Sequence, residues 1–399
     1  MSEALNRGAL PRARTTLIAL AAGTAALLAL IATPAADAEA GKAGKAVPFS
    51  VMTRNIFLGA DLSPALNSNN FQEFVSANGA ILREVDQTNF PLRAKGLAKE
   101  IKSRKPDLVG IQEGSWWRTG PEPTAEHPFA QGEGANFTAT TTKYEFLQLL
   151  LDQLNKKTNK KYKGYRLAVV GTEFDFEAPA DYDNNLATGQ LFGGEVMGRL
   201  TMRDAILVRK GGAVKVKRPK TGHFANLYTP NIGGIDVSVT RGWVSLNATA
   251  KRGEGKDAIK RKFRFVNSHF EAFDEETQHP SIRALQAMEL ADGPASNPKS
   301  IILGDFNSDV PGVQPGDEQA YQALLDAGFR ERGTDERTSC CVSNMFTSPP
   351  SEFDHRVDHV MTNMGKRVKL VKSEITGKEQ RNRIYDSDHA GVFSRLKIK

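Results

Sequence analysis

Residues of the kinds that bind metal ions and phosphate follow short apolar segments of this sequence. Ser300–Gly304 is an apolar run that ends at Asp305 and Asn307. In an extended chain, residues two positions apart face the same side, so these two side chains should share one site. A carboxylate beside an amide can hold a hydrated hard cation and position a water or a phosphate oxygen. An Asx turn after the strand is the alternative explanation.

The same placement recurs at two other apolar segments. Leu108–Ile111 runs directly into Gln112 and Glu113, and Asn55 follows the first apolar segment of the globular region. A carboxylate at the end of an apolar strand loses hydration unless a cation or a hydrogen-bond donor meets it. Each of these positions alone is weak evidence, but both carry the side chains that a metal-dependent reaction needs.

Histidines and aspartates complete the pattern. His269 follows the apolar segment 263–268, Asp358 begins another segment, and Asp388 and His389 stand before the last one. An aspartate that accepts a hydrogen bond from one imidazole nitrogen fixes the tautomer and raises the basicity of the other nitrogen, as a water-activating base requires. A structural histidine is the alternative for each ring taken singly.

The elements that must position these residues alternate between strands and helices. We expect mixed sheets covered by helices, because the connections between strands are of both hairpin and crossover type. The predicted strands span residues 49–53, 108–111, 205–208, 263–268, 300–303, 357–361 and 391–396, and the predicted helices span residues 91–103, 144–156, 281–290 and 318–327.

The N-terminal residues are predicted to lie outside this fold. Residues 1–38 have a basic start, an uncharged Ala- and Leu-rich run and the cleavage pattern Ala36-Asp37-Ala38, as a secretory signal peptide does. An uncleaved membrane anchor is the alternative, since the apolar run is nearly long enough to cross a bilayer. We expect a secreted protein with a flexible leader at 39–46 and one domain at 47–399, which carries an insertion around 114–199.

Composition is that of an ordinary globular protein, with 40% hydrophobic and 25% charged residues in a chain of 399. The net charge is +7, and loss of residues 1–38, with three arginines and two acids, leaves +6. This excess favours anionic substrates without demanding them. The two cysteines, Cys340 and Cys341, are adjacent, which excludes a disulfide scaffold. They would form either a strained vicinal bridge or a pair of thiols.

Taken together and in this order, the motifs resemble those of the endonuclease/exonuclease/phosphatase superfamily, which includes DNase I-like nucleases, bacterial sphingomyelinases and inositol polyphosphate phosphatases. The resemblance covers nearly the whole mature chain and implies an α/β (α+β) four-layer sandwich, with two mixed sheets flanked by helices. The matching residues are Asn55 in TRN, Glu113 in DLVGIQE, His269 in VNSHFEA, Asp305 and Asn307 in ILGDFN, Asp358 in RVDHV, and Asp388 and His389 in SDH.

The resemblance also implies a role for each matching residue. Glu113 would be the principal ligand of Mg²⁺, with Mn²⁺ or Ca²⁺ as alternatives, and Asn55 and Asp388 would complete the metal site. Asp305 and Asn307 would position the attacking water and the phosphate. Asp358 would orient His389, which would activate water or hold the phosphate, and His269 would bind a phosphoryl oxygen or protonate the leaving group.

Two further residues are candidates for substrate contact. Arg203 precedes the strand at 205–208 and would reach the phosphate; a surface salt bridge is the alternative. Trp117 lies just beyond Glu113 and would stack on a base or sugar or touch a lipid; packing in the core is the alternative. The basic stretches 209–220 and 251–262 could follow a nucleic-acid backbone or be solvated hairpin faces.

The sequence predicts a monomeric hydrolase of phosphate esters with no obligate protein partner. A phosphodiesterase or nuclease is the leading hypothesis, since the charge is mildly positive. A phospholipid or sphingomyelin phosphodiesterase, or a small-molecule phosphatase, would use the same chemistry on another substrate, which the fold does not choose. A non-catalytic binding protein that retains the fold is the alternative of a different class, and the intact set of polar residues speaks against it.

Overall fold

The computed structural model describes residues 44–157, 159–273, 279–312 and 318–399. The predicted signal peptide and most of the predicted leader lie outside these residues. Gly44–Lys399 forms one compact unit. Within the described part of the chain, no helix combines the length and the apolar character needed to cross a membrane.

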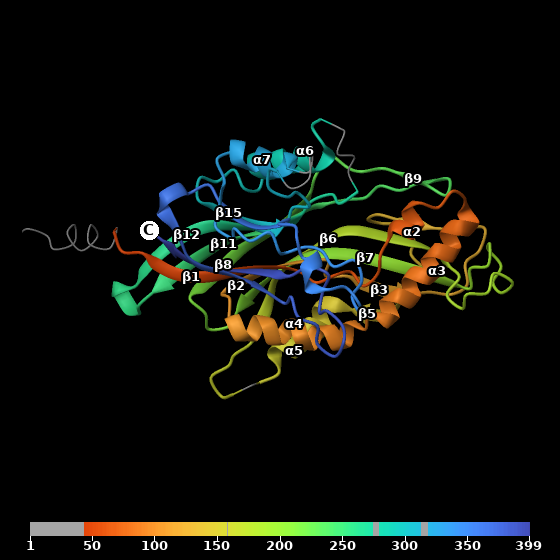
Figure 1. Cartoon of the computed structure of the whole chain (residues 1–399), viewed down its shortest axis with the longest axis horizontal. Coiled ribbons are helices and arrows are strands. Elements are labelled where there is room, and N and C mark those ends of the chain that lie inside the picture. The colour runs from red at the N-terminus through yellow and green to blue at the C-terminus, as the bar shows by residue number, and fades with distance from the viewer. Residues whose placement is uncertain (1–43, 158, 274–278, 313–317) are drawn as a thin grey trace, which may run out of the picture. The chain divides into compact units, whose positions relative to one another are not determined.

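Two mixed β-sheets form the centre of this unit (Figure 1). The strands of the first are β1 (Val47–Asn55), β2 (Leu108–Gln112), β3 (Trp116–Thr119), β4 (Ala130–Gln131), β5 (Thr141–Glu145), β6 (Tyr165–Ala180), β7 (Val196–Arg209), β16 (Val368–Thr376) and β17 (Gly391–Ile398). They pair in the order β16-β17-β1-β2-β7-β3-β5, while β6 pairs with both β7 and β4.

The second sheet has six strands. They are β8 (Val214–His223), β11 (Gly242–Arg252), β12 (Ile259–His269), β13 (Ser300–Asp305), β14 (Arg330–Glu331) and β15 (Asp358–Thr362). Their order is β14-β15-β13-β12-β11-β8, and a separate two-stranded ribbon joins β9 (Asn231–Ile232) to β10 (Ile235–Asp236). An apolar cluster that includes Val51, Ile206, Leu246 and Phe265 joins strands of the two sheets. The two sheets therefore pack face to face.

Helices cover the outer face of each sheet, as Figure 1 shows. The helices are α2 (Ser63–Leu66), α3 (Phe71–Gln87), α4 (Phe90–Arg104), α5 (Phe146–Asn155), α6 (Ile282–Asp292) and α7 (Gln319–Asp326), with short 3-10 turns at Gly255–Asp257, Pro350–Glu352 and Gly365–Arg367. α3, α4 and α5 pack on the nine-stranded sheet, whereas α6 and α7 pack on the six-stranded sheet. The predicted four-layer α/β sandwich is confirmed.

Local sequence explains where α4 begins and ends. The Asn89 side chain accepts a hydrogen bond from the backbone N–H of Leu92, and Pro91 stands in the first turn, where its missing N–H costs nothing. Lys105 ends the helix in the left-handed conformation. The helix places Arg93 and Phe90 against the loop that follows β1, and so it supports one side of the site.

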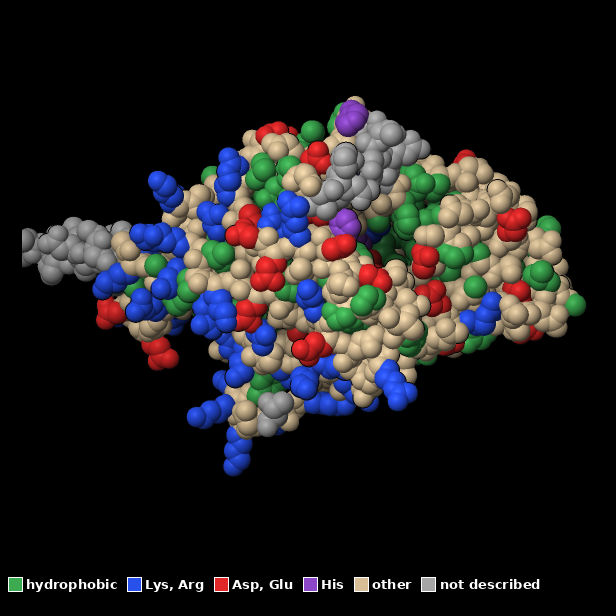
Figure 2. All heavy atoms as spheres, in the orientation of Figure 1, with side chains coloured by type: hydrophobic (Ala, Val, Ile, Leu, Met, Phe, Trp, Pro, Cys, Tyr) green, Lys and Arg blue, Asp and Glu red, His purple; other side chains and the backbone are tan. Residues whose placement is uncertain are grey.

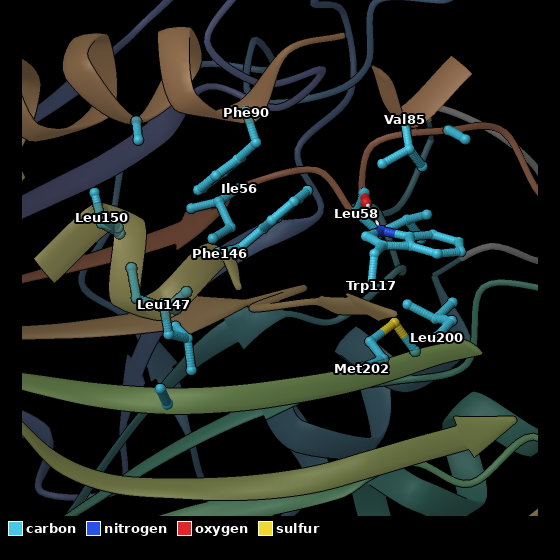
Figure 3. Packing of buried hydrophobic residues seen from close by; sticks show 14 of the residues in the cluster. Ile56, Leu58, Val85, Phe90, Trp117, Phe146, Leu147, Leu150, Leu200 and Met202 are labelled. Atoms are coloured by element: carbon cyan, nitrogen blue, oxygen red, sulfur yellow. Dashed lines mark hydrogen bonds between the residues drawn. The ribbon is translucent and has the colours of Figure 1, made fainter. Parts of the chain in front are cut away.

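A large aromatic contact joins α4 to α5. The rings of Phe90 and Phe146 are stacked with their centroids 3.6 Å apart, and both residues are fully buried. Figure 3 shows these rings beside Ile56, with Leu147 and Leu150 of α5 nearby. Complete burial of one such ring contributes about 1.5–3 kcal/mol. This contact anchors both helices under the C-terminal end of β1, where Ile56 follows the strand.

Residues 114–199 are part of the central architecture. They contain β3, β4, β5, α5 and β6 and the beginning of β7, and β6 pairs with β7 along almost its whole length. The segment therefore extends the nine-stranded sheet on the side of β7, where the sequence predicted loops around a single helix. That it is an insertion relative to similar proteins stays a prediction.

Candidate active site

Four of the predicted site residues stand at the C-terminal ends of two parallel strand pairs, whereas Asp358 begins β15 and Asp388 and His389 precede β17. β1 and β2 are parallel neighbours in one sheet, so Asn55 and Glu113 leave their strands side by side. β12 and β13 are parallel neighbours in the other sheet, where His269 pairs with Asp305. The two pairs meet because the Asn55 Nδ2 donates a hydrogen bond of 3.0 Å to the Asp305 Oδ2.

Glu113 lies at the wall of an open cleft of about 730 Å³, which Asp388 also lines. Its Oε2 accepts a hydrogen bond of 2.5 Å from the backbone N–H of Leu58. The pKa of Glu113 is raised to about 7, mainly by burial and also by the Asp388 carboxylate, while His389 and Asn55 act to lower it. Glu113 adopts φ 59°, a left-handed conformation that is uncommon outside glycine and is found at functional sites.

His389 is held between carboxylates. Its Nδ1 lies 2.9 Å from the Asp358 Oδ2, and its Nε2 lies 3.5 Å from the Asp305 Oδ2. Burial lowers the pKa of the imidazole, but Asp358, Asp305 and Asp388 outweigh burial and raise this pKa well above its ordinary value. The raised pKa favours the charged imidazolium at neutral pH, and the contact of Nδ1 with Asp358 is the one that the resemblance implied.

His269 is held in the opposite charge state. Its Nδ1 lies 3.2 Å from the Arg241 Nη1, and its Nε2 lies 3.0 Å from the Asn307 Nδ2 and 3.5 Å from the Asp305 Oδ2. Burial and the Arg241 cation lower the pKa of His269 to about 3. His269 is therefore a neutral ring at neutral pH, packed between Arg241, Asn307 and Asp305.

Asp305 is the point at which these contacts converge. Its Oδ2 accepts from Asn55 and lies 3.5 Å from the Nε2 of both His269 and His389, while its Oδ1 accepts from the Asn307 backbone N–H at 3.0 Å. Asn307 has φ 45°, which turns the chain back to the site. The Asp305 side chain and the Asn307 N–H therefore form the Asx turn that was the alternative explanation, and not the extended segment that was predicted. The two side chains still lie at one site, because the Asn307 Nδ2 lies 3.0 Å from the His269 Nε2.

Three buried arginines support the site, and sequence reasoning missed them. Arg93 binds the backbone oxygens of Ile56, Phe57 and Asp386 and so holds the loops on both sides of the cleft. Arg54 donates to the backbone oxygen of His389 and pairs with Glu100. Arg241 orients His269, as described above. Arg54 directly follows an apolar strand, which was a signal for it, whereas Arg93 stands in a predicted helix with several other cations and Arg241 lies outside every predicted element.

Asp204 occupies an unusual position behind the site. It is fully buried, and neither carboxylate oxygen has a hydrogen-bond partner among the described residues. Burial raises its pKa well above the ordinary value, and the nearby Glu173 adds to this, while Arg241 opposes it. Asp204 is close enough to the Arg241 guanidinium, which holds His269, for each group to affect the pKa of the other.

The two predicted substrate-contacting residues lie outside this cluster. The Arg203 Nε donates to the Gly114 backbone oxygen at 2.9 Å, and its guanidinium also pairs with Glu145, so we assign it to holding the loop after Glu113. This agrees with the salt-bridge alternative and corrects the predicted contact with phosphate. Trp117 is 4% exposed, packs in the core and donates from its Nε1 to the Leu58 backbone oxygen at 2.7 Å. Its predicted exposure to a base or sugar is therefore corrected as well.

The two basic stretches lie away from the catalytic residues. Residues 251–262 form the turn between β11 and β12, and β12 then runs ten residues to His269, roughly 33 Å in extended geometry. Residues 214–220 belong to β8, which pairs with β11 at the edge of the sheet and is mostly exposed. This position fits the alternative, a solvated hairpin face.

The cysteines and the other histidines have defined partners. Cys340 and Cys341 form a disulfide, and their sulfur atoms lie 3.7 Å and 3.5 Å from the His389 Nε2. His359 contacts Glu331 and the Ser308 backbone oxygen, and His355 contacts Asp309. We therefore assign His355 and His359 to structural contacts, whereas the cysteine pair contacts a catalytic candidate.

The donor set at the cleft fits a hard divalent cation. Glu113 and Asp388 face the same cleft, and Asn55 lies beside Glu113 and lowers its pKa. Burial raises the pKa of both carboxyl groups, Asp388 also raises the pKa of Glu113, and Asp305 also raises the pKa of Asp388. Such a pair of desolvated like charges is relieved by a cation, and carboxylate and amide oxygens are the ligands that Mg²⁺ and Ca²⁺ take. The residues Glu113, Asp388 and Asn55 would hold it.

Comparison with solved structures agrees with the fold. An endonuclease/exonuclease/phosphatase family protein from Bacteroides thetaiotaomicron matches with a TM-score of 0.50 and 14% identity, over 89% of this chain and 99% of that one. A family protein from Leptotrichia buccalis matches with a TM-score of 0.49 and 15% identity, over 87% and 99%. A mannosyl-6-phosphatase from Bacteroides thetaiotaomicron matches with a TM-score of 0.47 and 16% identity, over 87% and 99%.

Comparison by sequence gives the family. A search of curated proteins finds no match. The model of the Endonuclease/Exonuclease/phosphatase family matches residues 66–389, which include every proposed site residue except Asn55. The match therefore covers most of the chain and both sheets. The chain belongs to the endonuclease/exonuclease/phosphatase family, whose members are phosphoester hydrolases.

Proposed function

We propose that this protein is an extracellular, Mg²⁺-dependent phosphodiesterase that hydrolyses its substrate by in-line attack of water. The observation that carries the proposal is the convergence on Asp305. Two imidazole Nε2 atoms lie 3.5 Å from one of its oxygens, Asn55 bridges to it from the other sheet, and Glu113 is close enough for Asp305 to raise its pKa. A phosphoryl group in this cleft would meet donors and acceptors on several sides.

The chemistry follows from what each side chain can donate or accept. The pKa of His389 is raised, so its charged ring donates a hydrogen bond to a phosphoryl or leaving-group oxygen, where negative charge develops, and His269 lies beside Asp305 as a neutral ring. Asp305, the carboxylate between them, accepts the proton of the attacking water. Asn55 and Asn307 orient Asp305 through their bonds to its two oxygens. A Mg²⁺ ion at Glu113, Asp388 and Asn55 would add Lewis-acid stabilisation of the same charge.

A nuclease is a second candidate, and one observation favours it. A groove of about 950 Å³ between α4, α5 and the start of β6 is lined by ten Lys and Arg side chains and by no acidic one. Figure 2 shows Lys and Arg gathered on this side of the molecule. Lys105, which lines the groove, stands before β2, and Glu113 follows β2. The strand between them is roughly 17 Å long. A long polyanion could therefore span both places.

The test of the proposed function is turnover of bis-p-nitrophenyl phosphate by the purified protein. We expect hydrolysis with Mg²⁺, loss of activity to background with EDTA, and recovery when Mg²⁺ is restored, with Mn²⁺ and Ca²⁺ assayed in parallel. A non-catalytic binding protein would give no EDTA-sensitive turnover. Salt-sensitive degradation of plasmid DNA would support the nuclease, whereas release of phosphocholine from a phospholipid would support a lipid phosphodiesterase.

We also propose that the protein is exported and loses residues 1–38, on the evidence of the basic start, the apolar run and the pattern Ala36-Asp37-Ala38. Expression of the full chain in a bacterium with a general secretion system should yield a secreted form that begins at Glu39. N-terminal sequencing of the secreted protein tests this. A membrane-bound form that keeps the segment would instead support the anchor.

A further inference from the structure

An apolar cavity adjoins the catalytic cleft. Its volume is about 170 Å³, and its walls come from α2, α3, β3, β6, β7 and β9. Figure 3 shows part of this wall, where Leu58, Trp117, Leu200 and Met202 lie close together. Figure 2 shows a hollow with hydrophobic side chains at its edge on this face. The hydrogen bond from the Trp117 Nε1 to the Leu58 backbone oxygen fixes the indole as one side of the cavity.

The cavity and the cleft share part of their walls. Leu58, Leu62, Glu113 and Phe273 line both of them. Glu113, the proposed metal ligand, therefore stands at the boundary between a polar cleft and an apolar cavity. A ligand whose phosphate lies in the cleft can extend its next atoms past Glu113 into the cavity.

Polar groups in the cavity are few, and they are already engaged. Besides Glu113, they are Asn78, whose amide donates to the Pro179 backbone oxygen, and Arg241, which holds His269 and pairs with Glu271. A nucleobase placed here would leave the donors and acceptors on its edges without partners, which is costly in a buried site. A hydrocarbon chain in the same place has no hydrogen-bonding groups that would lose their partners, and its transfer from water into an apolar cavity is favourable.

We propose that this cavity binds the alkyl part of a phosphoester substrate, so that the protein prefers esters with an unbranched chain of about six to eight carbons next to the phosphate. A cavity of about 150 Å³ lined by Leu, Ile and Phe stays dry and takes up benzene, so a cavity of this size suits a chain of that length. The inference rests on the proposed function, because the phosphate must lie beside Glu113. It names the substrate class of that same site.

The expected effect is a dependence of rate on chain length. Methyl, butyl, hexyl, octyl and dodecyl p-nitrophenyl phosphates are to be compared with Mg²⁺ present. Each methylene that enters the cavity should raise kcat/KM by about fourfold, the factor that corresponds to burial of one CH₂ group. The rise should end at about six to eight carbons, when the cavity is full.

Two variants change the size of the cavity in opposite directions. Ala178→Leu adds three carbons to its wall and should shorten the chain at which the rise ends, by about three carbons. Leu200→Ala enlarges the cavity and should move that point to longer chains. Ala187→Leu is the matched control, because Ala187 is exposed and lies outside the cavity lining. It should leave the profile unchanged. Circular dichroism spectra establish that each variant is folded.

The outcomes separate this inference from the proposed function. EDTA-sensitive turnover of the methyl ester with no gain from longer chains would overturn the cavity assignment and leave the function standing. A preference for thymidine 5′-p-nitrophenyl phosphate over the hexyl ester, if it is lost in Ala178→Leu, would show that the cavity binds a nucleobase. This result would also overturn the proposed binding of an alkyl chain. If no ester is hydrolysed, the proposed function fails, and a binding measurement then tests whether the cavity holds an alkyl chain. A rise in Tm with octyl phosphate but not with methyl phosphate, which is absent in Ala178→Leu, would support alkyl binding in the cavity. Equal Tm values with the two phosphates would overturn it.

Discussion

Replacement of His389 by alanine is expected to lower kcat/KM for bis-p-nitrophenyl phosphate by about 10²–10⁴-fold, the span typical of losing a positioned acid or base. The His389 Nδ1 lies 2.9 Å from the Asp358 Oδ2, and its Nε2 lies 3.5 Å from the Asp305 Oδ2. Removal of the ring takes away a charged donor to the phosphoryl oxygens. It also leaves two buried carboxylates without their shared cation.

The controls for this variant separate catalysis from folding. Asp358→Asn keeps the shape of the side chain but removes the charge that holds His389. It should therefore also lower kcat/KM, by a smaller factor than His389→Ala. His223→Ala is the matched control, because His223 is exposed and contacts only the Thr172 backbone oxygen among the described residues. It should have nearly wild-type activity. A His389→Ala variant that is folded and turns over at a nearly wild-type rate would reassign His389 to a structural role.

The second large effect is expected for Glu113→Gln. The change removes one charge while keeping the size of the side chain, and the amide oxygen can still accept the hydrogen bond from the Leu58 N–H. Metal ions contribute several kcal/mol of charge stabilisation in the transition state, and about 3 kcal/mol corresponds to roughly 10²-fold in rate. We therefore expect kcat/KM to fall by at least about 10²-fold and the Mg²⁺ concentration for half-maximal activity to rise.

Titration of activity with Mg²⁺ measures both effects. Glu84→Gln serves as the control, since Glu84 lines the same cleft and burial raises its pKa, but it is not among the proposed metal ligands. It should leave the Mg²⁺ dependence unchanged. If the two variants shift the Mg²⁺ requirement equally, the effect belongs to the general charge of the cleft, and Glu113 loses its assignment as principal ligand.

The strands that carry the site were predictable from local patterns. Apolar runs at 49–53, 108–111, 263–268 and 300–303 became β1, β2, β12 and β13, and the polar residues that end these runs became the site. The reason is that burial of both faces of a central strand demands apolar residues in sequence, and a polar residue marks the point where the strand leaves the core. This signal is contained in a few consecutive residues.

Helix α3 was not predicted, and its Asn78-Gly79 pair explains why. This dipeptide is typical of turns, yet here it lies within a helix of 17 residues. A Cβ atom at position 79 would stand 1.8 Å from the Asp181 backbone oxygen, so the helix can approach that segment only with glycine. Glycine at position 79 allows close packing against a residue about a hundred positions away. Local periodicity in the sequence does not reveal such a contact.

The sequence by itself determined the family, the strands that carry the site and the residue types of the site, since each depends on short segments. Only the tertiary structure decided which partners these residues have. Arg241 orients His269 and Asn55 reaches Asp305 across the two sheets, while Arg203 and Trp117, which seemed equally placed in the sequence, support a loop and a cavity wall instead. The physical reason is that charge states and hydrogen bonds depend on distances between side chains. Those distances are set by how the sheets pack and not by separation along the chain.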